Sequence, residues 1–464
     1  MSLSLLLLSF LIAIAFVMIS IIKYKMHPFL ALLLGSLIMG VISGLPLPVI
    51  AASMAKGFGN TMGGIGIIIV LGVILGQLLY ESGATEAIAE SMLRATGRKN
   101  AVLAVNLTGL IVSVPVFFDA AFVILVNLVK QLSNKGKIPY ISLVSALACG
   151  LIITHCMVIP TPGPLAVAGA IGVNIGWMIF YAIIVSLIGS LVGGVLYAKA
   201  LGNRPEYRDD FAESALAQVE EASHEGETVA PEAKTRPSGS LGIFLIFLPI
   251  FLILLGTVFT TAFKMEGAAL NVLQFVGDKN IALLIGVVVA YFCLRKHISR
   301  GFDSLITTCG EQAGAIFIIT GAGGALAAVI NATGIGGALV EGMKGWTSTN
   351  ATVLLILVGW AISQTLRATT GSATVALVTT AGILAPIVTN MPISPVLVSL
   401  AICSGGVGVS LPNDSGFWVV NRFSGFTLNQ TFLCWTIPGT IAGLVIVGCL
   451  LILNMFSAVL PGLM

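Results

Sequence analysis

The chain has 464 residues, 57% of them hydrophobic and 9% charged, with a mean hydropathy of +1.06 and a formal net charge of +3. Its many apolar runs of about 20 residues could each cross a hydrocarbon core of roughly 30 Å, which predicts an all-α, polytopic membrane protein rather than a soluble domain. The small net charge does not indicate nucleic-acid binding. The seven scattered cysteines predict neither a disulfide framework nor a metal centre, and no cofactor is expected.

The first predicted span, residues 3–22, has neither the basic start nor the small-residue cleavage site of a signal peptide, so we expect it to remain as a crossing. Four more crossings are predicted in the first half: residues 28–46, 62–80, 139–174 with a break inside, and 175–200.

Between the third and fourth crossings, residues 101–132 form an apolar stretch that is interrupted by Pro115-Val-Phe-Phe-Asp119. Its two arms are short for full spans. They suit a re-entrant hairpin, in which the chain enters the membrane, turns at a polar tip and returns to the same side. The alternative is one or two ordinary spans. A charge at bilayer depth costs about 2.5–3.5 kcal/mol, so Asp119 indicates a polar cavity or a charged partner.

Residues 201–240 form the one clearly polar stretch of the sequence. The part from Asn203 to Ser238 holds nine of the nineteen acidic residues, which predicts a solvated, largely disordered linker between two membrane halves. A regulatory docking role for this linker is the alternative.

The second half, residues 241–464, has the same order of features. A second hairpin is predicted at 351–388, and its tip is Arg367-Ala-Thr-Thr-Gly-Ser372. The predicted crossings are residues 241–262, 280–296, 314–331, 394–421 with a break inside, and 434–456.

An internal repeat supports this division. Residues 81–129 align with residues 332–380 at a constant offset of 251 without a gap, and the identical pairs include Gly83 with Gly334 and Glu90 with Glu341. Because each half, 1–200 and 241–464, has an odd number of crossings, we expect two inverted repeats.

The lysines and arginines predict the orientation in the membrane. Seventeen of them fall on the side of the 201–240 linker and four on the other side, with Arg367 set aside as intramembrane. The positive-inside rule then places the linker in the cytoplasm and both termini outside. The first hairpin would enter from the cytoplasm and the second from outside.

Proline interrupts the crossing that follows each hairpin. Pro160 and Pro412 occupy matching places, at an offset of 252. Proline inside a membrane helix removes a backbone donor and splits the helix into two half-helices. The N-termini of half-helices offer free N–H groups and partial positive charge, so two tips and two breaks predict a transport site for an anion near the midplane.

Arg367 is the strongest candidate for binding this anion. Its guanidinium is always charged and its planar fork can hold a carboxylate through two parallel hydrogen bonds. The alternative is an internal ion pair with Asp119 or Asp414. Thr369, Thr370 and Ser372 add hydroxyls for a hydroxylated substrate, although such hydroxyls also bond to their own backbone.

Asp119 and Asp414 are the candidates for coupling transport to an ion gradient. A carboxyl group in a low-dielectric pocket can load and release a proton. Sodium is the alternative, because Asn413, Ser415 and the broken backbone could supply further oxygen ligands. Asp414 could instead cap the half-helix that follows it.

His155 lies one turn before the first break and could relay a proton, contact the substrate or pack as an interhelical donor. Thr161, inside that break, should face the bound molecule. Nucleotide-binding and catalytic signatures are absent from the sequence, so an ion gradient must supply the energy and no enzymatic activity is expected.

Three motifs resemble those of the gluconate permease family, which are gluconate:proton symporters of the ion-transporter superfamily: Pro115-Val-Phe-Phe-Asp119, Arg367 with Thr370-Gly-Ser-Ala-Thr-Val-Ala376, and Asn413-Asp-Ser-Gly-Phe-Trp418. The resemblance runs through nearly the whole chain. It implies uptake of sugar acids with protons across a bacterial inner membrane, with relatives that carry D-serine. It also implies hairpins in an elevator-type transport domain beside a scaffold, in a homodimer.

The chain departs from the family pattern at the first break, where Ile159 and Thr161 stand in place of a proline and a histidine. Because this break should face the bound molecule, the departure bears on the substrate more than on the fold. The other hypotheses are sodium-coupled or exchange transport of another organic acid or a D-serine-like amino acid, a ligand sensor, and an intramembrane enzyme using Asp119 and Asp414 as an acid pair.

Overall fold

The computed structural model describes residues 3–96, 100–211, 236–261, 268–335, 348–412 and 414–463, and every regular element within these ranges is a helix. Six of these helices are long and apolar enough to cross a membrane, or up to eight if each of two bent pairs counts as one span. The prediction of an all-α, polytopic membrane protein is therefore confirmed.

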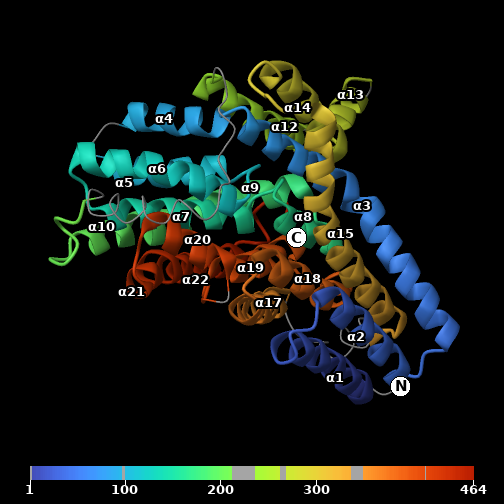
Figure 1. Cartoon of the computed structure of the whole chain (residues 1–464). Helices are drawn as coiled ribbons and strands as arrows, with labels where there is room; N and C mark the ends of the chain where they lie inside the picture. The colour runs from blue at the N-terminus through green and yellow to red at the C-terminus, as the bar shows by residue number, and fades with distance from the viewer. Residues whose placement is uncertain are drawn as a thin grey trace.

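The helices of the first half precede the linker and those of the second half follow it (Figure 1). The first set is α1 (Leu3–Ile22), α2 (Pro28–Ile42), α3 (Leu47–Glu81), α4 (Ala84–Thr96), α5 (Ala101–Val112), α6 (Phe118–Gly136), α7 (Tyr140–Met157), α8 (Pro162–Ile171), α9 (Ile175–Gly189), the π-helix η2 (Ser190–Leu196) and α10 (Tyr197–Gly202). The second set is α12 (Gly239–Thr261), α13 (Ala268–Gly277), α14 (Lys279–Leu294), α15 (Phe302–Ala332), α17 (Ser348–Thr370), α18 (Ala373–Val388), α19 (Pro395–Val407), α20 (Ser415–Ser424), α21 (Leu428–Thr431), the π-helix η3 (Phe432–Thr436) and α22 (Ile437–Met455).

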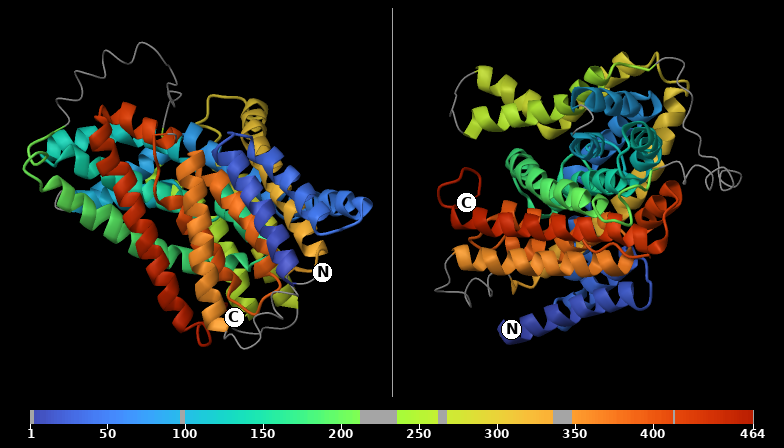
Figure 2. Two further views of the ribbon diagram at one scale, coloured as in Figure 1. Left: turned by 90° about the horizontal axis from the view of Figure 1, so that it is seen from below. Right: turned by 90° about the vertical axis from the view of Figure 1, so that its left-hand side faces the viewer.

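Two long helices, α3 and α15, lie side by side at the right of Figure 1, and α2 packs against α15. A glycine allows the close approach, because a Cβ added at Gly57 of α3 would lie 2.3 Å from the carbonyl oxygen of Gly324 in α15. In the rest of the molecule α5 and α6 lie against α7, and α18 packs on both α15 and α8. Figure 2 shows α17 and α22 side by side in both of its views.

Among the six described helices that are long and apolar enough to cross a membrane, the broken helix α7–α8 is the most buried. The most apolar window of the segment Tyr140–Ile171 is completely buried, against 44% for the corresponding window of residues 350–370 in α17. Since α8 and α19 also contact one another, the two broken helices lie at the centre of the molecule, and the longer continuous helices lie around them.

Three helices are longer than the sequence predicts. Lys56 lies inside α3 and Glu311 inside α15, because a single polar residue ends an apolar run without ending a helix. In the stretch predicted to be the second hairpin, α17 continues through Arg367 to Thr370, so this arm has 23 residues. The prediction that both arms are short is therefore wrong for α17, which is long enough to cross a membrane.

Matching local structures recur in the two halves. Gly83 and Gly334, which the repeat alignment pairs, have φ angles of 72° and 74°, a left-handed conformation that glycine adopts most readily. The half-helices α8 and α20 each have ten residues, and each ends at a left-handed glycine, Gly172 or Gly425.

Candidate functional site

Two helix starts and one helix end bring the candidate residues together. The chain turns after α17 at Gly371, whose φ is 68°, and Ser372 then caps α18 by accepting a hydrogen bond from the backbone N–H of Val375 at 3.4 Å. Asp414 caps α20 in the same way, with its Oδ1 accepting from the N–H of Gly416 at 3.0 Å. The predicted capping role of Asp414 is therefore present.

The starts of α18 and α20 meet at a cavity of about 200 Å³, here called the anion cavity. The helices α6, α18 and α20 all begin at its wall, because their first residues line it. Helix N-termini carry partial positive charge, so three of them at one cavity favour an anion. The lining residues are Phe117, Phe118, Asp119, Ile152, His155, Arg367, Gly371, Ser372, Ala373, Thr374, Asp414, Ser415, Gly416 and Trp435.

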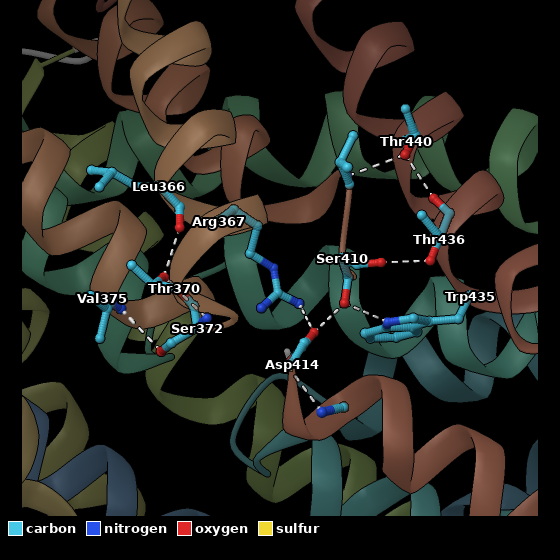
Figure 3. A network of polar contacts seen from close by, with 12 residues as sticks. Leu366, Arg367, Thr370, Ser372, Val375, Ser410, Asp414, Trp435, Thr436 and Thr440 are labelled. Atoms are coloured by element: carbon cyan, nitrogen blue, oxygen red, sulfur yellow. Dashed lines mark hydrogen bonds and ion pairs between the residues drawn. The ribbon is translucent and has the colours of Figure 1, made fainter. Parts of the chain in front are cut away.

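Arg367, in the last turn of α17, forms a buried ion pair with Asp414 (Figure 3). Its Nη2 lies 2.5 Å from Asp414 Oδ2, and the two side chains are only 2% and 5% exposed. Among the described residues nothing accepts a hydrogen bond from its buried Nε. The guanidinium thus pairs with Asp414 through Nη2 and also lines the anion cavity.

Three residues that the sequence analysis missed support this pair. The hydroxyl of Ser410 hydrogen-bonds Asp414 Oδ2, and Trp435 Nε1 donates to Ser410 Oγ at 2.7 Å. The Thr436 hydroxyl fixes the same residue by donating to the Ser410 carbonyl oxygen at 2.6 Å (Figure 3). Single polar residues in apolar segments give no spacing signal, so the sequence offers no way to connect Ser410 with Trp435.

Asp119 lies in the first turn of α6 and lines the anion cavity with an exposed side chain. The start of α6 is held close by packing of Phe118 on Trp435, whose ring centroids are 4.5 Å apart. The structure therefore brings both candidate carboxyls and Arg367 to one cavity, with two possible negative charges for one positive charge.

His155 and Thr161 lie on different sides of the first break. His155 lines the anion cavity next to Phe117, its ring centroid 6.1 Å away, and its buried Nδ1 has no hydrogen-bond partner among the described residues. Thr161 is 3% exposed, donates to the Val158 carbonyl oxygen and lines only a narrow space beyond His155. The structure thus places His155 at the cavity wall and Thr161 behind it.

The hydroxyls near Arg367 divide into two groups. Thr369 donates to the Thr365 carbonyl oxygen and Thr370 to the Leu366 carbonyl oxygen, both at 2.7 Å, and neither lines the anion cavity. Ser372 and Ser415 do line it. Asn413, the remaining candidate, lies outside the described residues.

Comparisons with known proteins agree with this picture. The family model for GntP family permeases matches residues 5–457. The gluconate permease of Pseudomonas aeruginosa is 33% identical over 457 residues, which cover 97% of this chain and 98% of that protein. The D-serine transporter DsdX of Escherichia coli is 34% identical over 443 residues, covering 94% and 95%.

Among solved structures, the YdaH transporter of Alcanivorax borkumensis matches with a TM-score of 0.64 at 16% identity, over 93% of this chain and 99% of that one, which is a likeness of fold. The match of the family model over nearly the whole chain and the full-length relatives confirm the resemblance seen in the motifs: the chain belongs to the GntP family of permeases and is a transport protein rather than an enzyme.

Proposed function

We propose that the protein imports a small hydroxylated carboxylate, gluconate or a related sugar acid, across the bacterial inner membrane by proton symport. The observation that carries this proposal is the buried guanidinium of Arg367 at a cavity where three helix N-termini meet. Both features favour an anion. The volume of about 200 Å³ is below the roughly 300–1,000 Å³ of sites for drug-sized ligands, so it suits a small molecule.

Arg367 would hold the substrate carboxylate. Its contact with Asp414 uses only Nη2, so Nη1 and the unpaired Nε remain as donors. A carboxylate can bind such a fork through two parallel hydrogen bonds. The hydroxyl groups of the substrate would then face Ser372 and Ser415, which line the same cavity.

Charge balance supports coupling to protons. The cavity holds one guanidinium and two carboxyls, so an incoming carboxylate adds negative charge where negative charge already exceeds positive. Protonation of Asp414 would weaken its pairing with Arg367 and release the fork, while protonation of Asp119 would remove repulsion directly. Because binding free energies are reciprocal, a proton that favours the substrate is itself bound more tightly when the substrate is present.

Asp414 is the less suitable of the two carboxyls for sodium. Its oxygens already accept from Arg367 and Gly416 and hydrogen-bond Ser410. Asp119, with Ser372 and Ser415 at the same cavity, is where sodium coupling, the alternative, would have to occur.

A second candidate substrate is a D-serine-like amino acid. Asp119 and Arg367 both line the cavity, so the ammonium group of a zwitterion could face the former and its carboxylate the latter. The D-serine transporter DsdX is as similar to this chain as the gluconate permease is, which supports this second candidate.

The proposal includes two inverted repeats, 1–200 and 241–464, with hairpins at 101–132 and 351–388, that work as an elevator-type transporter. The matched pairs Gly83 with Gly334 and α8 with α20 support the repeats. The cytoplasmic position of the 201–240 linker, the external termini and the homodimer stay predictions from charge distribution and from family resemblance.

Uptake by purified protein in proteoliposomes tests the function. Gluconate, glycerate, a uronate and D-serine are offered under a pH gradient alone and under a sodium gradient alone. We expect the acids to accumulate under the pH gradient. Accumulation driven by sodium without a pH gradient would establish the alternative coupling.

The two coupling residues are tested in the same vesicles. Asp119→Asn and Asp414→Asn should both keep measurable substrate binding, and at least one should abolish accumulation driven by the pH gradient. If both variants accumulate substrate as the unmodified protein does, neither residue carries the proton.

A further inference from the structure

A second cavity of about 390 Å³ adjoins the anion cavity. The two share Phe117, Asp119 and Thr374 in their walls, so they are contiguous at the tips of the first and second hairpins. Helix α3 also lines this second cavity, through Gly76, Gln77 and Tyr80. Neither Gln77 nor Tyr80 is part of the site described above.

A third cavity, of about 480 Å³, continues from the second and shares Tyr80 with it. Its lining mixes apolar side chains of α6 with five polar residues: Glu86 and Glu90 of α4, Asn127 and Gln131 of α6, and Arg236 just before α12. Arg236 pairs with Glu90 at 3.4 Å, and the two side chains are 56% and 37% exposed. The series of cavities therefore ends at the surface where the linker joins the second half.

Gln77 is held in a defined orientation. Its Nε2 donates to Glu81 Oε1 at 3.0 Å, and Arg300, from the connection between α14 and α15, lies 3.6 Å from the same oxygen. The bond to Glu81 uses one of the two N–H groups of Gln77 and fixes which end of its amide faces Glu81, which leaves the carbonyl oxygen to accept hydrogen bonds. An acceptor at this place binds the hydroxyl hydrogens of a polyol chain and does not bind its carboxylate.

We infer that this series of cavities is the path by which substrate leaves the site toward the linker side of the membrane, and that Gln77 on α3 contacts the substrate hydroxyls along it. The inference rests on the proposed function for what passes, and it adds the route and a recognition residue. Glu81 is a positioning residue here, since it acts through the amide of Gln77.

Thiol labelling tests the route. Cys293 and Cys449, which are not buried, are replaced by serine, and Gln77→Cys is introduced into that background. A membrane-impermeant thiol reagent is then applied to inside-out and to right-side-out vesicles. We expect labelling at position 77 only in inside-out vesicles, where the linker side is accessible, and slower labelling when gluconate is present.

The control is Ile67→Cys on the same helix. Ile67 is 58% exposed but lines an apolar groove with Phe58, Val70 and Phe317, so it should face lipid and react from neither side. Tyr80→Cys provides a second position on the path in case the first variant does not fold. Labelling from the outer side, or no labelling of either path position in folded protein, would overturn the inference.

Transport kinetics test the role of Gln77. Besides its bond to Glu81, Gln77→Leu removes one hydrogen bond to the substrate of about 0.5–1.5 kcal/mol, which corresponds to a rise of about two- to tenfold in KM for gluconate. An unchanged KM would remove Gln77 from recognition. Labelling needs no transported substrate, so uptake without labelling refutes the route alone, whereas labelling without uptake of any compound refutes the proposed function alone.

Discussion

Thr161 and Asp414 are the N-cap residues of α8 and α20, two half-helices of ten residues at matching places in the two halves. The hydroxyl of Thr161 donates back to Val158, and α8 then begins with Pro162-Gly163-Pro164. Asp414 instead accepts from the first turn of α20 and pairs with Arg367. The cap of the first break therefore lines only a narrow space, whereas the cap of the second break lines the anion cavity.

The difference comes from the residues after each cap. Proline has no backbone N–H, so two of the first three positions of α8 have no donor to offer a ligand. Ser415 and Gly416 keep their N–H groups at the start of α20, and that of Gly416 already donates to Asp414. A helix break thus creates room and free backbone groups, and the residues that follow decide whether these groups can bind an anion. Four predictions examine this difference.

The largest effect is expected from removing the acid of the second break. Asp414→Ala leaves the buried guanidinium of Arg367 without its partner, which costs about 3–5 kcal/mol. Thr161→Ala in the first break loses one hydrogen bond of about 1 kcal/mol. Thermal unfolding of the two purified variants should show the larger loss of stability for Asp414→Ala. Equal losses would mean that the two caps have the same structural role.

The next effect concerns binding. Arg367→Lys keeps the positive charge but not the planar fork, so it loses one charge-assisted hydrogen bond of about 1.5–3 kcal/mol, or roughly ten- to a hundredfold in affinity. Equilibrium binding of gluconate measures the loss. The control is Arg422→Lys, an exposed arginine in the last turn of α20. Unchanged affinity in Arg367→Lys would remove Arg367 from the site.

A third prediction concerns the close packing of α3 on Pro115 and Pro160. A Cβ added at Gly76 would lie 1.9 Å from the carbonyl oxygen of Pro115, and one at Gly72 would lie 3.0 Å from that of Pro160. Gly76→Ala should therefore cost about 1–3 kcal/mol in stability, and Gly72→Ala less. Gly59→Ala is the control, because nothing lies within 4 Å of its added methyl group. Identical melting temperatures in all three variants would show that α3 can move away from Pro115 and Pro160 without loss of stability.

The smallest effect is expected at the turn after α17. The Thr370 hydroxyl donates to Leu366 and accepts from the N–H of Ser372 at 3.3 Å, so it stabilises the turn rather than a ligand. Thr370→Val should cost about 1 kcal/mol in stability and leave affinity unchanged. Thr365→Val, which removes a hydroxyl bonded only to Ala361 among the described residues, is the matched control. If only Thr370→Val lost affinity for gluconate, the Thr370 hydroxyl would contact the substrate after all.

Sequence reasoning located the fold class and the central residues because both depend on local signals. Apolar length predicts membrane helices, and Arg367, Asp119 and Asp414 stand out as charges in apolar surroundings. The ends of α3, α15 and α17 were missed because a polar residue inside a buried helix resembles a break. The supports of Asp414 could not be predicted, since Ser410 and Trp435 meet only through tertiary packing.

The hydrogen bond from Trp435 to Ser410 makes the indole an optical sensor of the neighbouring acid. Ser410 stands between the ring nitrogen and Asp414, so neutralising that carboxyl redirects the hydroxyl and alters the polarity around the ring. Indole emission responds to such changes without any attached dye. With the other four tryptophans replaced by phenylalanine, the remaining fluorescence should change with pH in real time if Asp414 takes up the proton, as proposed.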